Sequence, residues 1–513
     1  MSAGVLRGAP VRDEVDVVIV GAGFAGIAMA TMLARRGRES FVVIERADAV
    51  GGTWRDNTYP GIACDIPAHL YSFSFRPPAD WTSVYPSGDE IKRYLEQTVA
   101  DEGLLSSIRL SCELTNATWD SDVSRWTVAT TAGEIGARVL VLAVGRLAEP
   151  RIAGIEGLDS FSGTVVHTAA WRPDIEIDGA RIGVVGTGAS AVQVAPHLAE
   201  RAEELVVFSR TPPYVVPRED RRYTVAERAH YLDPHVAEGV RESLLRDADI
   251  AFRQRQRRHP DIDEIRSRAL SHLHNQVTDP LLRQLLTPDY EIGCKRILLS
   301  DDFYPMLLRD NVVFEASALE SVTECKARAV SGQSYDLDLL VLATGFAAAR
   351  PPIAARIIGS GGRLLERHWS RGMTSYASTV VNGFPNMFVL DGPNAALGHN
   401  SAIYMIETQV GYVLGALDAL AGPGVSALEV SAAAEAAYTA EIDERAESTV
   451  WLTGCDSWYV DPDTRRLTLL WPGTARSFRE RNGRFEIAPF MVNGNPYNEN
   501  LYTEGPYCVG GEC

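Results

Sequence analysis

The clearest feature of the chain is a pattern of apolar runs and glycine turns that occurs twice. Strand-like runs at 15–20 and 181–185 each lead directly into a glycine-rich turn and then into a segment with apolar residues at helical spacing. A second strand-like run follows each helix, at 41–45 and 204–208. Short, nearly continuous apolar runs are typical of parallel strands that are covered on both faces. The pattern therefore predicts an α/β fold with two doubly wound, Rossmann-like dinucleotide-binding domains.

Each turn has the glycine spacing of a dinucleotide-binding motif. The first contains Gly21, Gly23 and Gly26, and the second contains Gly186 and Gly188 with an alanine in the third position. Glycine permits the tight turn and lets the backbone approach a pyrophosphate, whose charge is favoured at a helix N-terminus. One such motif is weak evidence, but the strand before it and the helix after it make the prediction specific.

The residue that ends the second strand differs between the two units. Glu45 ends it in the first unit, whereas Ser209, Arg210 and Thr211 follow it in the second. A carboxylate suits a free ribose hydroxyl, and an arginine suits a 2′-phosphate. We therefore expect FAD in the first unit and NADPH in the second. The alternative that Arg210 is only a solvated surface charge stays open.

Two later apolar runs, at 138–145 and 336–346, end in small-residue turns and predict where the chain leaves each domain. We expect a discontinuous FAD-binding domain of residues 1–157 and 347–513, including a C-terminal tail, and an NADPH-binding domain of residues 158–346.

Residues 220–290 have the pattern of charged amphipathic helices, with apolar positions such as Leu245, Ile250 and Phe252. We interpret them as a helical insertion in the NADPH-binding domain. The basic run at 253–259 has acidic neighbours on both sides, so we predict a solvated helix face there.

Composition narrows the possible partners. The chain has 513 residues, of which 46% are hydrophobic, and a formal net charge of -18, which argues against a nucleic-acid partner. The most apolar stretch, 412–430, is interrupted by charged and turn residues, so no membrane span is expected, and residues 1–13 lack the apolar core of a signal peptide. These features predict a cytoplasmic protein. They do not indicate its oligomeric state.

The 7 cysteines are scattered and form neither a disulfide framework nor a zinc pattern, so we expect no metal site. Cys508 and Cys513 are a close pair, but chain ends are usually poorly ordered, and Cys455 is expected to be packed.

The segment between the two glycine motifs reads F-x-G-x-x-x-H-x-x-x-W, with Gly163, His167 and Trp171 at its marked positions. Together with the two glycine motifs, this segment resembles the fingerprint of type I Baeyer–Villiger monooxygenases. These flavoproteins use NADPH and oxygen to convert ketones into esters or lactones. The family usually has proline or aspartate after the tryptophan, where this chain has Arg172. Related enzymes that oxidise amines and sulfides typically carry another aromatic at the Trp171 position.

The resemblance implies roles for further residues. A carboxylate matching Asp65 lies close to the flavin in this family, and Arg296 matches the active-site arginine. Judged alone, Asp65 could be a turn residue and His167 a core histidine. The other residues expected to bind the two cofactors, by motif or by resemblance, are Gly52, Thr53, Trp54, Tyr71, Ser190, Gln193, Thr211, Lys295, Thr344, Gly345, Asn400 and Ser401.

The chemistry implied by the resemblance is oxygen insertion next to a ketone carbonyl. NADPH would reduce the flavin, oxygen would add at its C4a carbon, and the resulting peroxide would attack the carbonyl. Arg296 would stabilise the peroxide anion, and Asp65 would orient the arginine. His167 and Trp171 would couple domain motion to catalysis without touching the substrate.

Three alternatives stay open. The same flavin chemistry could oxygenate sulfur or nitrogen. A non-oxygenating NADPH-dependent flavin reductase normally needs a cysteine pair beside the flavin, and the first flavin-domain segment has only Cys64 and Cys112, which are far apart in sequence. The third alternative is a protein that binds nucleotides as a sensor and catalyses no reaction. The sequence does not name the ketone or the position of oxygen insertion.

Overall fold

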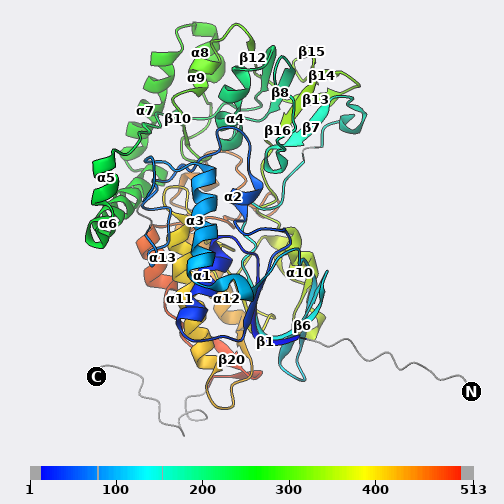
Figure 1. Cartoon of the computed structure of the whole chain (residues 1–513), viewed down its shortest axis with the longest axis vertical. Coiled ribbons are helices and arrows are strands. Elements are labelled where there is room, and N and C mark those ends of the chain that lie inside the picture. The colour runs from blue at the N-terminus through cyan, green and yellow to red at the C-terminus, as the bar shows by residue number, and fades with distance from the viewer. Residues whose placement is uncertain (1–12, 78–79, 153, 498–513) are drawn as a thin grey trace, which may run out of the picture.

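The computed structural model describes residues 13–77, 80–152 and 154–497. Figure 1 shows two lobes, each built around its own sheet. We call them the lower lobe and the upper lobe, as they stand in that view.

The lower lobe contains an 8-stranded sheet in the order β17-β4-β5-β6-β1-β2-β3, with β18 also pairing with β6. The strands β1, β2 and β6 are parallel, whereas β4, β5 and β6 form an antiparallel meander. Because β17 and β18 come from the last third of the chain, this sheet is assembled from both ends of the sequence. Its strands are β1 (Asp13–Val20), β2 (Phe41–Ile44), β3 (Ile108–Arg109), β4 (Leu114–Asp120), β5 (Arg125–Thr130), β6 (Gly133–Leu142), β17 (Ile357–Ile358) and β18 (Met387–Val389).

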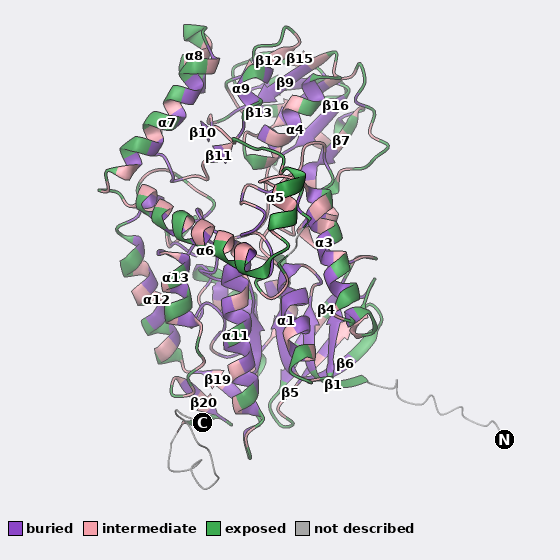
Figure 2. Cartoon of the chain, turned by 60° about the vertical axis from the view of Figure 1, so that its left-hand side comes forward, coloured by how far each residue is buried: buried purple, intermediate pink, exposed green. Residues whose placement is uncertain are grey.

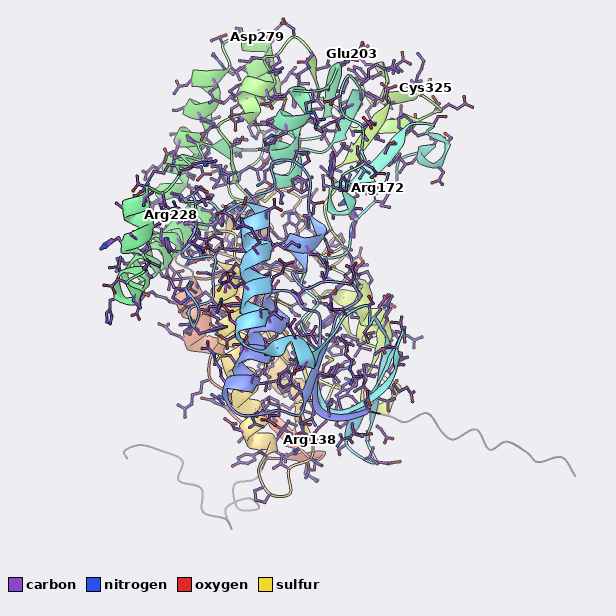
Figure 3. The ribbon with its side chains drawn as sticks, in the orientation of Figure 1. Arg138, Arg172, Glu203, Arg228, Asp279 and Cys325 are labelled. Carbon is purple, nitrogen blue, oxygen red and sulfur yellow. A yellow bond between two sulfur atoms is a disulfide. The ribbon has the colours of Figure 1, made fainter. Side chains whose placement is uncertain are left out.

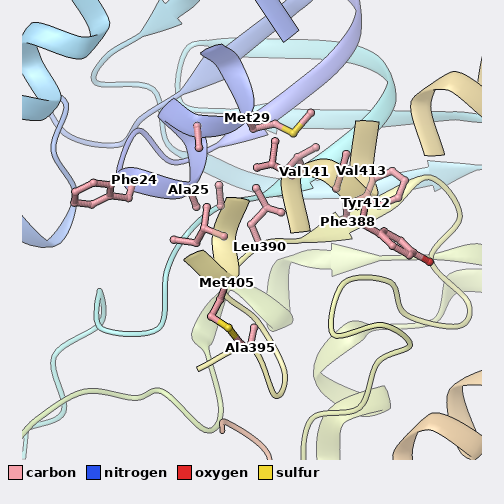
Figure 4. Close-up of a cluster of buried hydrophobic side chains, with 14 of the residues drawn as sticks. Phe24, Ala25, Met29, Val141, Phe388, Leu390, Ala395, Met405, Tyr412 and Val413 are labelled. Atoms are coloured by element: carbon pink, nitrogen blue, oxygen red, sulfur yellow. The ribbon is translucent and has the colours of Figure 1, made fainter. Parts of the chain in front are cut away.

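Helices α1 (Phe24–Arg35), α3 (Gly88–Asp101) and α11 (Ala402–Leu420) cover one face of this sheet (Figure 1). Figure 4 shows Met29 of α1 and Met405 of α11 in the layer of side chains that also contains Val141 and Phe388. Both helices are buried over most of their length because they lie between the sheet and other elements.

The upper lobe contains a 5-stranded parallel sheet in the order β12-β9-β8-β16-β7. Its strands are β7 (Thr164–His167), β8 (Arg181–Val185), β9 (Glu204–Phe208), β12 (Val312–Glu315) and β16 (Leu339–Leu342), and helices α4 (Ala189–Ala199) and α9 (Phe303–Met306) pack against it. The linker supplies the edge strand β7, so His167 lies beside the end of β16.

The predicted helical insertion consists of α5 (Val225–His230), α6 (Pro234–Ile250), α7 (Asp261–Gln276) and α8 (Pro280–Leu286). It spans both lobes. Leu245 of α6 belongs to the core of the lower lobe, whereas Leu273 of α7 belongs to the core of the upper lobe. Figure 2 shows α6 lying beside α13 (Ala475–Asn482). The apolar face differs from the prediction at Ile250, which is exposed at the end of α6.

The remaining elements are short or peripheral, except for α12. They are α2 (Thr53–Asp56), α10 (Leu365–His368), α12 (Ala432–Ala446), β10 (Val215–Val216), β11 (Leu298–Leu299), β13 (Leu319–Val322), β14 (Lys326–Ala329), β15 (Ser334–Asp336), β19 (Leu428–Val430), β20 (Phe490–Val492) and β21 (Asn495–Pro496).

The predicted strands 15–20, 41–45, 181–185 and 204–208 all form, within two residues of the expected bounds. Within the described part of the chain, no helix combines the length and the apolarity that crossing a bilayer requires. Cys508 and Cys513 lie outside the described residues.

Candidate active site

An ion pair between the lobes joins the two residues predicted to be catalytic. Arg296 Nε donates to Asp65 Oδ2 over 2.6 Å, and the side chains are 28% and 29% exposed. Burial opposes ionisation of Asp65, but Arg296 outweighs it and holds the pKa of the carboxyl below its usual value. Burial likewise opposes the charge of Arg296, and Asp65 outweighs it and raises the pKa of the guanidinium. Both groups are therefore charged at neutral pH.

A second arginine approaches Asp65 from the upper lobe. Arg218 Nη2 lies 3.5 Å from the carbonyl oxygen of Cys64, the residue before Asp65, and its guanidinium stands over the ring of Tyr85. Its charge also favours the ionised form of Asp65. A cleft of about 590 Å³ runs beside this contact, between residues 58–63 and 82–90 of the lower lobe and residues 218–222 of the upper lobe.

The two predicted coupling residues bind parts of the protein that lie far apart in sequence. His167 Nε2 lies 3.1 Å from the carbonyl oxygen of Gly345, and Nδ1 accepts the N–H of Ala169 at 3.1 Å. Since a carbonyl can only accept, Nε2 carries the proton. The carbonyl of Trp171 accepts the hydroxyl of Thr58, which belongs to the lower lobe. These contacts connect the linker with the exit turn of the upper lobe and with a loop near Asp65.

Arg172, where the family pattern differs, is exposed and pairs with Asp174. Figure 3 shows it at the lower edge of the upper lobe. The departure therefore adds a surface charge and leaves the neighbouring contacts intact.

The first glycine turn is packed as a nucleotide-binding turn requires. Gly21 has a φ of +104°, and a Cβ atom there would stand 2.6 Å from the carbonyl oxygen of Ala143. A Cβ on Gly26 would stand 1.8 Å from the carbonyl oxygen of Gly21. Gly23 lies against Gly52, and a Cβ atom added to Gly52 would stand 3.0 Å from the Cα of Gly23. The tertiary structure thus brings together two glycine clusters that the sequence separates.

Glu45 is buried at the end of β2 and accepts N–H groups from Ala22 at 2.8 Å and Ala47 at 3.0 Å. Arg55 pairs with it at 2.9 Å. These bonds fix the carboxylate beside the glycine turn, and a carboxylate has further acceptor positions for a ribose hydroxyl.

The predicted flavin-contacting cluster lies on α2 and the loop after it. Thr53 and Trp54 form the first turn of α2, after Gly52 with a φ of +52°. Trp54 Nε1 lies 3.3 Å from the hydroxyl of Tyr71, and the two rings meet edge to face. Tyr71 also packs edge to face against Phe24 at the start of α1.

The second turn repeats the first. Gly186 has a φ of +111°, and its Cβ would stand 2.7 Å from the carbonyl oxygen of Ala343 in the exit segment, whereas Gly188 faces open space. Thr344 donates its hydroxyl to the carbonyl of Arg151, and Gly345 has a φ of +82°.

Two cations gather at the end of β9. Arg210 is exposed, and Thr211 accepts the hydroxyl of Thr187 through its carbonyl oxygen. Lys295 stands 4.6 Å from the centre of the Tyr290 ring. Burial, and then the charge of Arg210, lower the pKa of Lys295. Two like charges near enough to act on each other favour a bound anion, as a 2′-phosphate would be.

Ser190 and Gln193 contact the lower lobe. Gln193 accepts the hydroxyl of Tyr59 at 3.0 Å and donates to the carbonyl of Ala63 at 2.9 Å. The hydroxyls of Tyr59 and Ser190 are 3.4 Å apart. These predicted cofactor residues therefore also belong to the contact between the lobes.

Asn400 and Ser401 stand at the start of α11. Ser401 is its N-cap and accepts the N–H of Ile403, while Asn400 accepts the N–H of Ser401 and donates to Asp249 at 2.9 Å. Both side chains are buried and fix the orientation of the helix N-terminus.

The structure places further polar groups near Arg296 that sequence reasoning missed. Arg146 is half-buried and pairs with Asp391, and its pKa is lowered to about 10, mainly by desolvation. Tyr459 is buried where the charges of Arg296 and Arg255 both act on it. His399 is buried directly before Asn400. Two sequence signals lay near these residues: His399 directly precedes Asn400, and Tyr459 ends the run 454–459, which resembles a segment of the family.

Arg255 contradicts the prediction for the basic run at 253–259. It is only 7% exposed, although Arg253, Arg257 and Arg258 of the same run are exposed. The segment Ala251–Arg255 is a 3-10 helix, whose turn directs this one side chain inward. The acidic residues on both sides of the basic run therefore did not predict the solvent exposure of each side chain within it.

The cysteine prediction was also incomplete, because Cys294 and Cys455 form a disulfide. A sequence separation of 161 residues gave no signal for it. The bond joins the residue before Lys295 to the segment that carries Tyr459. A cysteine pair is thus present in the structure, but it lies outside the first flavin-domain segment, which leaves the reductase alternative open.

Known proteins resolve this ambiguity. A family model described as pyridine nucleotide-disulphide oxidoreductase matches residues 18–255. A Baeyer–Villiger monooxygenase from Streptomyces coelicolor is 40% identical over 487 residues, which cover 94% of this chain and 93% of that protein. The structure of oxidized steroid monooxygenase bound to NADP has a TM-score of 0.82 and 30% identity, covering 94% of this chain and 99% of the other.

The structure of OTEMO in complex with FAD and NADP has a TM-score of 0.82 at 25% identity, and it covers 92% of this chain and 97% of that chain. These likenesses each cover more than nine-tenths of the chain, and the family model includes the segment of Asp65 and the linker. The predicted fold class and resemblance are confirmed: the chain belongs to the Baeyer–Villiger monooxygenases.

Proposed function

We propose that this protein uses FAD and NADPH to insert one oxygen atom next to the carbonyl of a small-molecule ketone, which gives an ester or a lactone. Molecular oxygen is the co-substrate. The observation that carries this proposal is the Asp65–Arg296 ion pair between the two nucleotide-binding units. The family name of the Streptomyces relative supports the reaction, and the OTEMO complex supports the cofactors.

The lower lobe fits FAD. Gly21, Gly26 and Gly52 keep the backbone closely packed where side chains would be crowded, and Glu45 is fixed beside the turn for a ribose. Thr53, Trp54, Tyr71 and the N-terminus of α11 complete the proposed flavin contacts, and a helix N-terminus favours the negative charge of a reduced flavin.

The upper lobe fits NADPH. Gly186 and Gly188 would face the pyrophosphate, while Arg210 and Lys295 would hold the 2′-phosphate. We propose that the domain boundaries follow this division, with residues 158–346 forming the NADPH-binding domain and the remainder the FAD-binding domain.

The flavin would supply the transfer of electrons from NADPH and the activation of oxygen. Arg296 contributes a charge that does not titrate near neutral pH. Of its N–H groups, only Nε has a hydrogen-bond partner within the described part of the chain, so the Nη groups can donate to oxygen that becomes negative during the transfer. Asp65 orients this guanidinium. His167 and Trp171 hold the linker between the lobes and position them.

The test is a panel of ketones and matched thioethers offered to the purified, FAD-loaded protein with NADPH. We expect consumption of NADPH that depends on oxygen, and ester or lactone products that have gained one oxygen atom by mass spectrometry. Sulfoxides without any ester would support the sulfur-oxygenating alternative instead. NADPH oxidation without oxygenated product from any ketone would contradict the proposal.

A further inference from the structure

Arg255 is a buried cation without a counter-ion in the described structure. Its Nη1 donates to the carbonyl of Ala251 at 3.0 Å and to Oε1 of Gln254 at 2.7 Å, and its Nη2 donates to the carbonyl of Gly398 at 3.3 Å. These acceptors are all neutral, and burial lowers the pKa of Arg255 only to about 10, so it remains charged at neutral pH.

Two other arginines in this region, both half-buried, differ from Arg255, because Arg296 pairs with Asp65 and Arg146 pairs with Asp391. Buried charges are normally paired, since an uncompensated charge in the interior is costly. The region around Arg255 therefore carries one positive charge that the described protein does not neutralise.

His399 lies beside Arg255, and both of its ring nitrogens are buried. It is 8% exposed, and neither Nδ1 nor Nε2 has a hydrogen bond within the described residues. The carbonyl of Gly398, the preceding residue, is an acceptor for Arg255. Burial, and then the charges of Arg255 and Arg296, lower the pKa of His399 well below its usual value. The ring is therefore neutral, with one N–H donor and one acceptor nitrogen that a ligand can use.

The surroundings of this pair are aromatic. The ring centre of Phe252 lies 5.3 Å from that of His399 and 6.2 Å from that of Trp451. Tyr459 is buried in the same hydrophobic cluster as these rings, and both Arg255 and Arg296 act on it electrostatically. An apolar wall thus adjoins an uncompensated cation and a free imidazole, and the catalytic arginine is close to both.

We propose that Arg255 and His399 form a subsite that binds a carboxylate on the ketone substrate, so that the preferred substrates are keto acids with an apolar body. This inference rests on the proposed oxygenation of ketones. One carboxylate matches the single uncompensated charge, and it can accept from the guanidinium and from the imidazole N–H. The aromatic side chains accommodate the apolar body of the same molecule.

The experiment compares a keto acid of the oxoheptanoate type with its methyl ester, using the full-length, FAD-loaded enzyme. For the parent enzyme we expect a higher kcat/KM with the acid. Arg255→Gln should lower kcat/KM for the acid by about 10- to 100-fold, because a charge-assisted contact is lost. For the methyl ester, kcat/KM should change by less than about threefold. Arg253→Gln, an exposed arginine in the same segment, is the matched control and should leave both substrates unaffected.

A second variant and a binding measurement keep the inference testable if Arg255→Gln folds poorly. His399→Leu should lower kcat/KM for the keto acid and leave that for the ester unchanged. Arg255→Lys should have a higher kcat/KM for the keto acid than Arg255→Gln, because the positive charge is kept. Calorimetric titration of the oxidised enzyme with the keto acid, without NADPH, reports binding alone. If this binding depends on Arg255 but no ketone is oxygenated, the proposed function fails while the subsite stands.

Three results would overturn the inference. If Arg255→Gln lowers kcat/KM equally for the acid and the ester, Arg255 serves the oxygen-transfer centre and not the substrate carboxylate. Loss of bound FAD in the properly folded variants would mean that the pair holds the cofactor. A parent enzyme that neither binds the acid nor prefers it over the ester would show that no carboxylate subsite exists.

Discussion

Replacing Asp65 by asparagine tests how much of catalysis depends on the orientation of Arg296. The substitution keeps the size of the side chain and one oxygen acceptor but removes the charge that pairs with Arg296 Nε at 2.6 Å. Two unit charges about 4 Å apart interact by about 4 kcal/mol at an effective dielectric constant of about 20. The side chains are 28% and 29% exposed, so solvent screening reduces this value, and we take about 2 kcal/mol.

If this free energy holds the guanidinium in place during oxygen transfer, Asp65→Asn should slow that step by about 30-fold. Arg296→Ala removes the charge itself and should slow it by about a hundred- to a thousand-fold or more, in the range found for the loss of one transition-state donor. The asparagine variant should therefore show the milder form of the same defect.

Stopped-flow measurements should follow flavin reduction by NADPH separately from product formation, because Arg296 could also help to place the nicotinamide. Asp89→Asn is a suitable control, since Asp89 is an exposed aspartate on the cleft near Asp65. The reasoning is wrong if Asp65→Asn forms ester at the parental rate. It is also wrong if Arg296→Ala does so, and the catalytic arginine must then be sought elsewhere.

Four further predictions follow from other contacts. Arg210→Ala should weaken NADPH binding at least about tenfold in titrations while NADH binding changes little, and equal losses would exclude a phosphate contact. Burial and the charge of Arg210 lower the pKa of Lys295, so Lys295 loses its charge at a lower pH than an ordinary lysine does. The KM for NADPH should rise as the pH passes through this lowered pKa. Arg210→Ala should move the rise in KM to higher pH, because one of the causes of the lowered pKa is removed. Cys455→Ser should destabilise the fold by about 2 kcal/mol in denaturant unfolding, a difference that must vanish under reducing conditions if it comes from the bond to Cys294. Burial lowers the pKa of His69 from 6.5 to about 4. The free energy of unfolding should therefore fall by up to about 3 kcal/mol as the pH drops from 6.5 to about 4, and His69→Phe should remove that loss. A pH dependence of stability that is the same in His69→Phe would refute this role of His69.

The sequence by itself determined the elements whose signals are local. The strands at 15–20 and 181–185 were predicted within two residues, and the glycine turns and the presence of a helix after each were predicted too, because a buried parallel strand and a glycine turn are each specified by adjacent residues. The family was predicted from motifs in the same way, and the known relatives confirm it.

Pairings between distant residues depended on the resemblance or remained unpredicted. Asp65 and Arg296 were assigned together only because the family places them together, and their contact exists because two lobes meet. The disulfide between Cys294 and Cys455 gave no signal at all, since nothing along the chain brings those residues near each other.

The tertiary structure alone decided which polar groups are buried. Arg255 lies in a run of arginines that all look solvated in the sequence, yet it turns inward while Arg253 stays exposed. His399 lacks a hydrogen-bond partner among the described residues for a similar reason: whether a side chain faces water, protein or a ligand depends on the packing of elements that are far apart in sequence. Hydrophobic patterning follows the solvent exposure of whole elements, and it cannot specify the surroundings of a single polar side chain where two lobes come together.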